Sequence, residues 1–111
     1  MNDSGLIQIP SRHSMKETRH LLESAFASHG LQVFARIDHT GEAEKVGLKM
    51  PPTQVLIFGS PKVGTLLMIA VLSLAIDLPW KALVGEDDQG RVWVTYNGAK
   101  YLKERHGVPR T

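Results

Sequence analysis

The chain has no cysteine among its 111 residues. Disulfide bonds, zinc sites with thiolate ligands and a cysteine nucleophile are therefore excluded. Hydrophobic residues make up 42% and charged residues 22% of the chain, which is the balance of an ordinary globular protein. A chain of this length can bury a core of its own, so we expect residues 1–111 to form a single domain.

A long hydrophobic run is missing too. The longest apolar stretch covers residues 66–76 and is interrupted by Ser73, so it is about half as long as the roughly 20 residues that cross a bilayer. The first ten residues lack the basic region and the apolar core of a signal peptide. We therefore expect a soluble, cytoplasmic protein that has no membrane partner.

Strong charge of one sign is also absent, because the formal net charge is only +2. The basic residues are not interleaved with aromatic ones, so we expect no nucleic-acid partner. The five histidines form neither an H-x-x-x-H pair nor another recognised metal spacing, and no metal site is predicted. No serine of the chain lies in a G-x-S-x-G elbow, so a hydrolase has no support from this motif. The sequence does not indicate which cofactor, if any, the protein binds.

What the sequence does contain is an alternation of strand and helix patterns. Ser14 and Glu17 have the spacing of a capping box ahead of an apolar stripe with helical period. The turn residues Asp87 to Gly90 predict a hairpin between the last two strands. The predicted strands cover residues 6–9, 31–38, 55–58, 80–86 and 91–96, and the predicted helices cover residues 15–29, 40–46, 65–76 and 99–106.

These elements follow the order β-α-β-α-β-α-β-β-α. Helices placed between strands, followed by a terminal hairpin, favour an α+β fold. We expect a two-layer sandwich in which the helices pack on a mixed sheet of about five strands.

The segment G-S-P-K-V-G-T, residues 59–65, follows an apolar strand and precedes an apolar helix. It lacks the Walker pattern, because Gly64 and not a lysine stands before Thr65, and its glycine spacing does not fit a Rossmann loop. A helix starting near Thr65 presents unpaired N–H groups and a partial positive charge. A small anion or a carboxylate is therefore the candidate ligand, bound by Gly59, Ser60, Lys62, Gly64 and Thr65.

The same loop also has a purely structural interpretation. In that case the two glycines permit a tight turn, Pro61 stiffens it and Thr65 caps the helix. The sequence leaves both interpretations open.

A second candidate site is the pair Asp38 and His39, at the end of a predicted strand where loops often carry function. It favours a different class of protein, an enzyme or a metal-dependent protein that uses both residues together with Lys62. Adjacent strand residues point to opposite faces, so a direct hydrogen bond between them needs a bend in the chain. Whether the chain is an enzyme stays open.

Several segments in a fixed order resemble a known family. They are R-I-D-H, A-E-K-V-G-L, P-P-T-Q-V-L-I-F-G, G-S-P-K-V-G-T, I-D-L-P, E-D-D-Q-G-R-V-W-V-T-Y-N and Y-L-K-E-R-H-G-V. Together they are similar to domain-of-unknown-function family 302 of bacteria and archaea, over about residues 14–108. The resemblance implies a small α/β sandwich, a homodimer and no established activity.

The chain departs from the family pattern at the loop. The usual loop reads G-N-P-K, and Ser60 stands here in place of the asparagine. The usual continuation is polar, whereas residues 66–72 of this chain are apolar. We expect that a family site at this loop is altered or lost here, and that the apolar helix serves association.

Overall fold

The computed structural model describes residues 4–108. Its elements follow the predicted order, with one short 3₁₀ helix added before the fourth strand. The strands are β1 (Leu6–Ser11), β2 (Gln32–Asp38), β3 (Thr53–Gly59), β4 (Trp80–Glu86) and β5 (Val92–Asn97). The helices are α1 (Met15–Ser28), α2 (His39–Lys45), α3 (Pro61–Ala70), the 3₁₀ helix η1 (Leu72–Ile76) and α4 (Ala99–His106).

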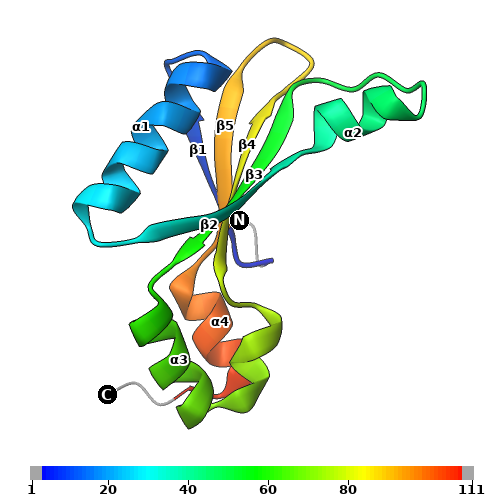
Figure 1. Cartoon of the computed structure of the whole chain (residues 1–111). Coiled ribbons are helices and arrows are strands. Elements are labelled where there is room, and N and C mark those ends of the chain that lie inside the picture. The colour runs from blue at the N-terminus through cyan, green and yellow to red at the C-terminus, as the bar shows by residue number, and fades with distance from the viewer. Residues whose placement is uncertain (1–3, 109–111) are drawn as a thin grey trace.

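The five strands form one sheet in the order β1-β5-β4-β3-β2. The predicted α+β class is confirmed, but every pairing in the sheet is antiparallel, which corrects the expectation of a mixed sheet. Helices between strands suggested parallel neighbours, because parallel strands need a crossover connection. Here α2 and the α3–η1 segment lie beyond the ends of the strands that they join, so the chain returns in the opposite direction (Figure 1).

Helix α1 joins the two edge strands and covers one face of the sheet. The first half of the predicted capping box forms, since the Glu17 amide donates to Ser14 Oγ at 3.1 Å, and the Glu17 carboxylate accepts from the Ser14 hydroxyl at 3.1 Å. Phe26 of α1 stacks on Phe58 of β3 with ring centroids 3.9 Å apart. The buried hydrophobic residues of the strands lie on this same face: Leu56, Ala82, Val84, Val92 and Val94.

The chain is less compact than its length allows. The radius of gyration of the Cα atoms is 15.3 Å, whereas a compact domain of about 100 residues has a value of about 13 Å. Helices α3, η1 and α4 gather at one end of the sheet, away from α1 and α2 (Figure 1). At that end Ile69, Leu72 and Ile76 are 76%, 79% and 71% exposed, so the chain leaves apolar surface uncovered there.

Candidate functional site

The loop after β3 caps helix α3 with its own atoms. The helix begins at Pro61 and not near Thr65, which corrects the predicted start. Ser60 is the N-cap: its Oγ accepts from the Val63 amide at 3.3 Å, and its carbonyl accepts from the Gly64 amide at 2.8 Å. Proline suits the first helical position because it has no N–H to leave unpaired.

The end of this helix differs from the prediction as well. Helix α3 stops at Ala70, Val71 adopts an extended conformation, and η1 follows as a separate element. Gly64 lies inside the helix, where a glycine is tolerated at some cost in stability, although its residue type suggested a loop.

The capped helix start offers few groups to an inorganic anion. The amides of Val63 and Gly64 are already bonded to Ser60, and Pro61 has none. The first turn carries no acidic residue, so the positive end of the helix dipole is not neutralised there. The geometry therefore favours a ligand that is held by more than backbone amides.

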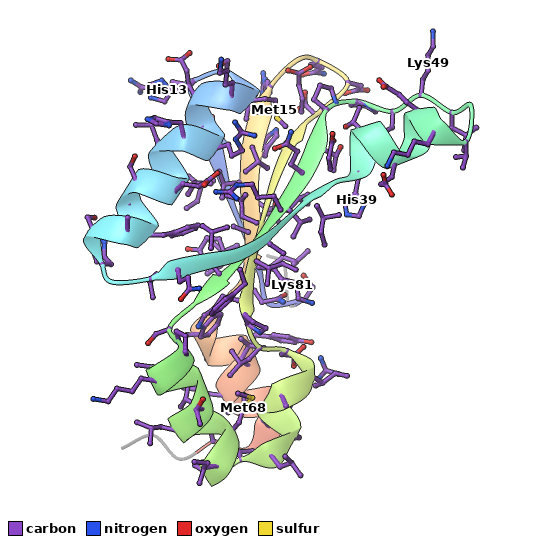
Figure 2. The ribbon with its side chains drawn as sticks, viewed as in Figure 1. His13, Met15, His39, Lys49, Met68 and Lys81 are labelled. Carbon is purple, nitrogen blue, oxygen red and sulfur yellow. The ribbon has the colours of Figure 1, made fainter. Side chains whose placement is uncertain are left out.

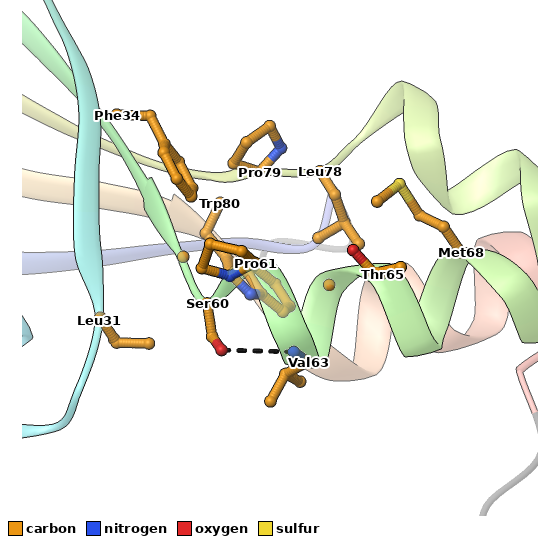
Figure 3. Close-up of a pocket in the computed structure, with 12 residues that line it drawn as sticks. Leu31, Phe34, Ser60, Pro61, Val63, Thr65, Met68, Leu78, Pro79 and Trp80 are labelled. Carbon is orange, nitrogen blue, oxygen red and sulfur yellow. Dashed lines mark hydrogen bonds between the residues drawn. The ribbon is translucent and has the colours of Figure 1, made fainter.

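A pocket of about 240 Å³ opens beside this helix start. Figure 3 shows it between α3, the beginning of β2 and the segment that leads into β4. Of the predicted site residues, Gly59, Ser60, Gly64 and Thr65 line the pocket. The rest of its wall is apolar: Leu31, Phe34, Pro61, Val63, Met68, Leu78, Pro79 and Trp80.

Two glycines, Gly59 and Gly64, line this pocket, and the space around them differs. A Cβ atom added at Gly59 would lie 3.6 Å from the Phe34 ring and 3.7 Å from Trp80, which is ordinary contact. A Cβ atom added at Gly64 would meet no atom within 4 Å outside its own stretch of helix. Gly64 therefore leaves space that a larger side chain could fill.

The lining decides which chemistry the pocket suits. No charged side chain belongs to it, and its polar side chains are the hydroxyls of Ser60 and Thr65. Burying an unpaired charge in apolar surroundings is strongly unfavourable, whereas burying an apolar group there is favourable. A bound molecule thus fits best with an apolar body inside the pocket and any charge at the rim.

The remaining predicted site residues lie outside the pocket. Lys62 is exposed on α3. Asp38 Oδ1 accepts from the Gly41 amide at 3.1 Å, so this carboxylate caps α2. His39 is the first, exposed residue of α2, and Figure 2 shows it far from Met68 of the pocket. Among residues 4–108, no three His, Asp or Glu side chains are placed to hold a metal ion.

Sequence reasoning missed Phe34 in the aromatic wall of the pocket. Phe34 lies where the pairing of β2 with β3 shifts register between Val33 and Ala35. Such a bulge changes the direction of a side chain, and the residue pattern of this strand does not predict it. Trp80 reaches the pocket from the start of β4, a strand that the sequence places correctly without assigning this residue a ligand.

A polar group at the contact of η1 with α4 was missed as well. Ser73 Oγ lies 2.7 Å from His106 Nδ1, and His106 Nε2 lies 2.6 Å from Asp77 Oδ2. Arg105 donates to both Asp77 carboxylate oxygens at 3.2 Å. Ser73 and Asp77 lie in one part of the sequence and Arg105 and His106 in another, 28 to 33 positions away, so the fold brings the two parts together.

The curated relatives that the chain matches are longer proteins. It is 43% identical over 106 residues to a protein named fluoride-specific ion channel FluC 1 from Brucella suis biovar 1, covering 96% of this chain and 42% of that protein. A FluC 1 protein of Brucella abortus biovar 1 matches with the same identity, over 96% of this chain and 39% of its own length. The chain thus spans about two fifths of these relatives.

A solved structure shows the same fold. The crystal structure of an uncharacterized conserved protein DUF302 from Bacillus stearothermophilus superposes with a TM-score of 0.87 and 20% sequence identity, over 96% of this chain and 83% of that one. Residues 7–111 match the family described as domain of unknown function DUF302. The structural likeness and the family match agree with the resemblance seen in the sequence, and the chain belongs to the DUF302 family.

Proposed function

We propose that this chain is a small-molecule-binding domain, and that its pocket accepts an organic carboxylate with an apolar body. The observation that supports this most is the apolar pocket of about 240 Å³ with the Ser60 and Thr65 hydroxyls among its lining. The apolar body contacts Phe34, Trp80 and their neighbours. The carboxylate lies at the rim near the positive end of α3, where Lys62 follows Pro61.

A thermal-shift screen with matched ligand pairs tests this proposal. Small aromatic and aliphatic carboxylates, such as benzoate, are compared with their neutral amides, such as benzamide. A ligand at about 100 times its dissociation constant adds roughly 2.7 kcal/mol to the free energy of unfolding. We expect the acids to raise Tm more than the amides. Equal shifts for acids and amides would contradict the preference for a carboxylate. No shift for either class would contradict the binding of such ligands.

Two glycine variants show whether binding uses this pocket. Gly64→Leu fills the space beside α3, and we expect it to abolish the ligand-induced shift. Gly85→Leu is the matched control, because Gly85 also has no atom within 4 Å of an added Cβ but lies in β4, outside the pocket. Retained binding in Gly64→Leu would place the ligand elsewhere.

We infer further that the protein is a homodimer. Val63, Leu66 and Ile69 recur at a spacing of three along α3, and they are 53%, 58% and 76% exposed. We call these three residues the α3 strip. A helix face this apolar is covered in most soluble proteins, and a second copy offers an identical face to cover it. The large radius of gyration of the single protomer supports the same assembly.

A second candidate function comes from the Brucella relatives. No helix in residues 4–108 of this chain is long and apolar enough to cross a membrane, although the matched segment covers nearly the whole chain. A channel must cross the membrane, so its spanning part in the relatives lies outside the segment matched here. We propose that this chain acts as an accessory domain to a fluoride channel.

Fluoride tolerance of cells tests that second candidate. Cells express the Brucella suis relative either whole or without the segment matched here. We expect the deletion to lower tolerance, and we expect this chain, supplied as a separate protein, to restore it. Unchanged tolerance after the deletion contradicts the proposal. Fluoride also belongs in the ligand screen, with chloride as its control.

A further inference from the structure

Ser73, His106 and Asp77 form a continuous hydrogen-bonded chain at the end of the molecule that holds α3 and α4. Helix α4 lies there beside the α3–η1 segment (Figure 1). Ser73 is exposed on η1, whereas the His106 and Asp77 side chains are only 5% and 11% exposed. The serine thus faces solvent while the two groups behind it are held inside the protein.

The partners of His106 allow one arrangement of hydrogens in which its imidazole acts as a base. An ionised carboxylate only accepts hydrogen bonds, so His106 Nε2 carries a hydrogen and donates it to Asp77. In the neutral imidazole His106 Nδ1 is then the acceptor, and the Ser73 hydroxyl donates to it. Arg105 holds the Asp77 carboxylate from a second side. In this arrangement the serine proton points at an imidazole nitrogen whose ring is held in place by Asp77.

We propose that Ser73 is a nucleophile activated by His106 as general base, with Asp77 as a positioning residue, and that it reacts with esters of aliphatic carboxylic acids. The same three residue types, in the same order of contacts, activate serine in unrelated folds. Here the two histidine nitrogens exchange roles, because Nδ1 faces the serine and Nε2 faces the aspartate.

The acyl preference follows from the geometry of η1. Residues three apart eclipse one another in a 3₁₀ helix, so Ile76 lies on the same side of η1 as Ser73. Ile76 is 71% exposed, and it offers apolar surface next to the hydroxyl. An aliphatic acyl chain can cover that surface while its carbonyl carbon meets Ser73 Oγ.

The reaction runs in two steps. Ser73 Oγ attacks the ester carbonyl carbon while its proton passes to His106 Nδ1. The bond to the leaving alkoxide breaks, and the alkoxide takes the proton from His106 and departs as the alcohol. Water then attacks the acyl-serine with His106 again as base. The bond between the acyl carbon and Ser73 Oγ breaks, His106 returns its proton to Ser73 Oγ, and the carboxylic acid is released.

Covalent labelling with a fluorophosphonate, followed by peptide mass spectrometry, tests the nucleophile. The reagent is applied to the native protein and to Ile69→Asp. The substitution places a charge in the α3 strip, so Ser73 stays accessible in this variant even if a second copy covers this end of the native protein. We expect modification of Ser73 in at least one of the two proteins. Absence of Ser73 modification in both overturns the proposal.

The matched control is Ser28, whose Oγ lies 3.3 Å from His29 Nδ1. The histidine in this pair is exposed, whereas the His106 side chain is only 5% exposed. We expect Ser73→Ala to remove the label and Ser28→Ala to leave it unchanged. Gly64→Leu is expected to label normally, so failure of the pocket proposal and failure of this one remain distinguishable.

The roles of His106 and Asp77 are tested by the rate of p-nitrophenyl butyrate hydrolysis. We expect His106→Gln to slow the reaction about 100-fold or more, the range typical of a lost general base. Asp77→Asn places an amide against Nε2, which favours the wrong tautomer, so we expect a slower rate with a changed rate–pH profile. Thermal melts identify any variant that fails to fold. If folded Ser73→Ala hydrolyses the ester as fast as the native protein, the proposal is overturned.

Discussion

Among single residues, Gly64 lines the pocket and also carries a cost in helix stability. It lies inside α3, where glycine is less favourable than alanine by up to about 1 kcal/mol. An added methyl group meets no neighbour within 4 Å. We therefore expect Gly64→Ala to raise the free energy of unfolding by up to about 1 kcal/mol, measured by urea denaturation. A loss of stability would show that the space around Gly64 is not free.

Asp87 gives a prediction about pH at the same scale. A hydrogen bond from Trp93 Nε1 at 2.9 Å, helped by the amides of Arg91 and Gln89, lowers the pKa of the Asp87 carboxyl below its ordinary value of 3.8. A lowered folded-state pKa means that this stabilisation is present above the unfolded-state pKa and is lost as the pH falls through the folded-state pKa.

We expect Asp87→Asn to lose less stability than the native protein when the pH falls from 5 to 2. Thermal melts across that range measure the difference. The signal of the Trp93 indole N–H in an NMR titration should shift over the same range in the native protein only. A native indole signal that does not move between pH 5 and pH 2 contradicts this assignment.

At the scale of elements, Ser60 decides where α3 begins. The residue expected from the family pattern at this position is asparagine, and both residue types are strong N-caps. Replacing the family's asparagine by Ser60 therefore keeps the capping role at this position. We expect Ser60→Ala to cost about 1 kcal/mol of stability and Ser60→Asn to be nearly neutral, measured by chemical denaturation. An equal loss in both variants would argue against the cap.

The elements were predictable wherever local chemistry decides them. The capping box at Ser14 and Glu17 and the turn at Asp87 to Gly90 are local signals, and both elements form at the predicted places. The start of α3 was misplaced because a glycine inside a helix looks like a loop residue. The direction of strand pairing depends on where the connecting helices lie, and no single segment encodes that.

The candidate site was predictable only in part for the same reason. The loop residues Gly59, Ser60, Gly64 and Thr65 stand out in the sequence, and the structure brings all four to one pocket. The aromatic wall depends on a bulge at Phe34 and on pairing between distant strands. The contact of Ser73 with His106 joins η1 to α4 across 33 positions of the chain. Such juxtapositions leave no periodic pattern to detect.

At the scale of the whole molecule, the exposed apolar surface argues for association. Ile69 of α3 is 76% exposed. We expect sedimentation at micromolar concentration to give the mass of a dimer for the native protein and of a monomer for Ile69→Asp. Leu48→Asp is the matched control, since Leu48 is 63% exposed but lies after α2. A native protein that sediments as a monomer contradicts the assembly.

The central claim is that the pocket beside α3 binds an organic carboxylate. An amide-resolved NMR titration of the native protein with benzoate tests it most directly. We predict that the signals of Gly59, Gly64 and Trp80 shift in a saturable way, and that they shift much less with benzamide or in Gly64→Leu. Saturable shifts confined to Asp38 and His39, or no saturable shift at any amide, would contradict the account.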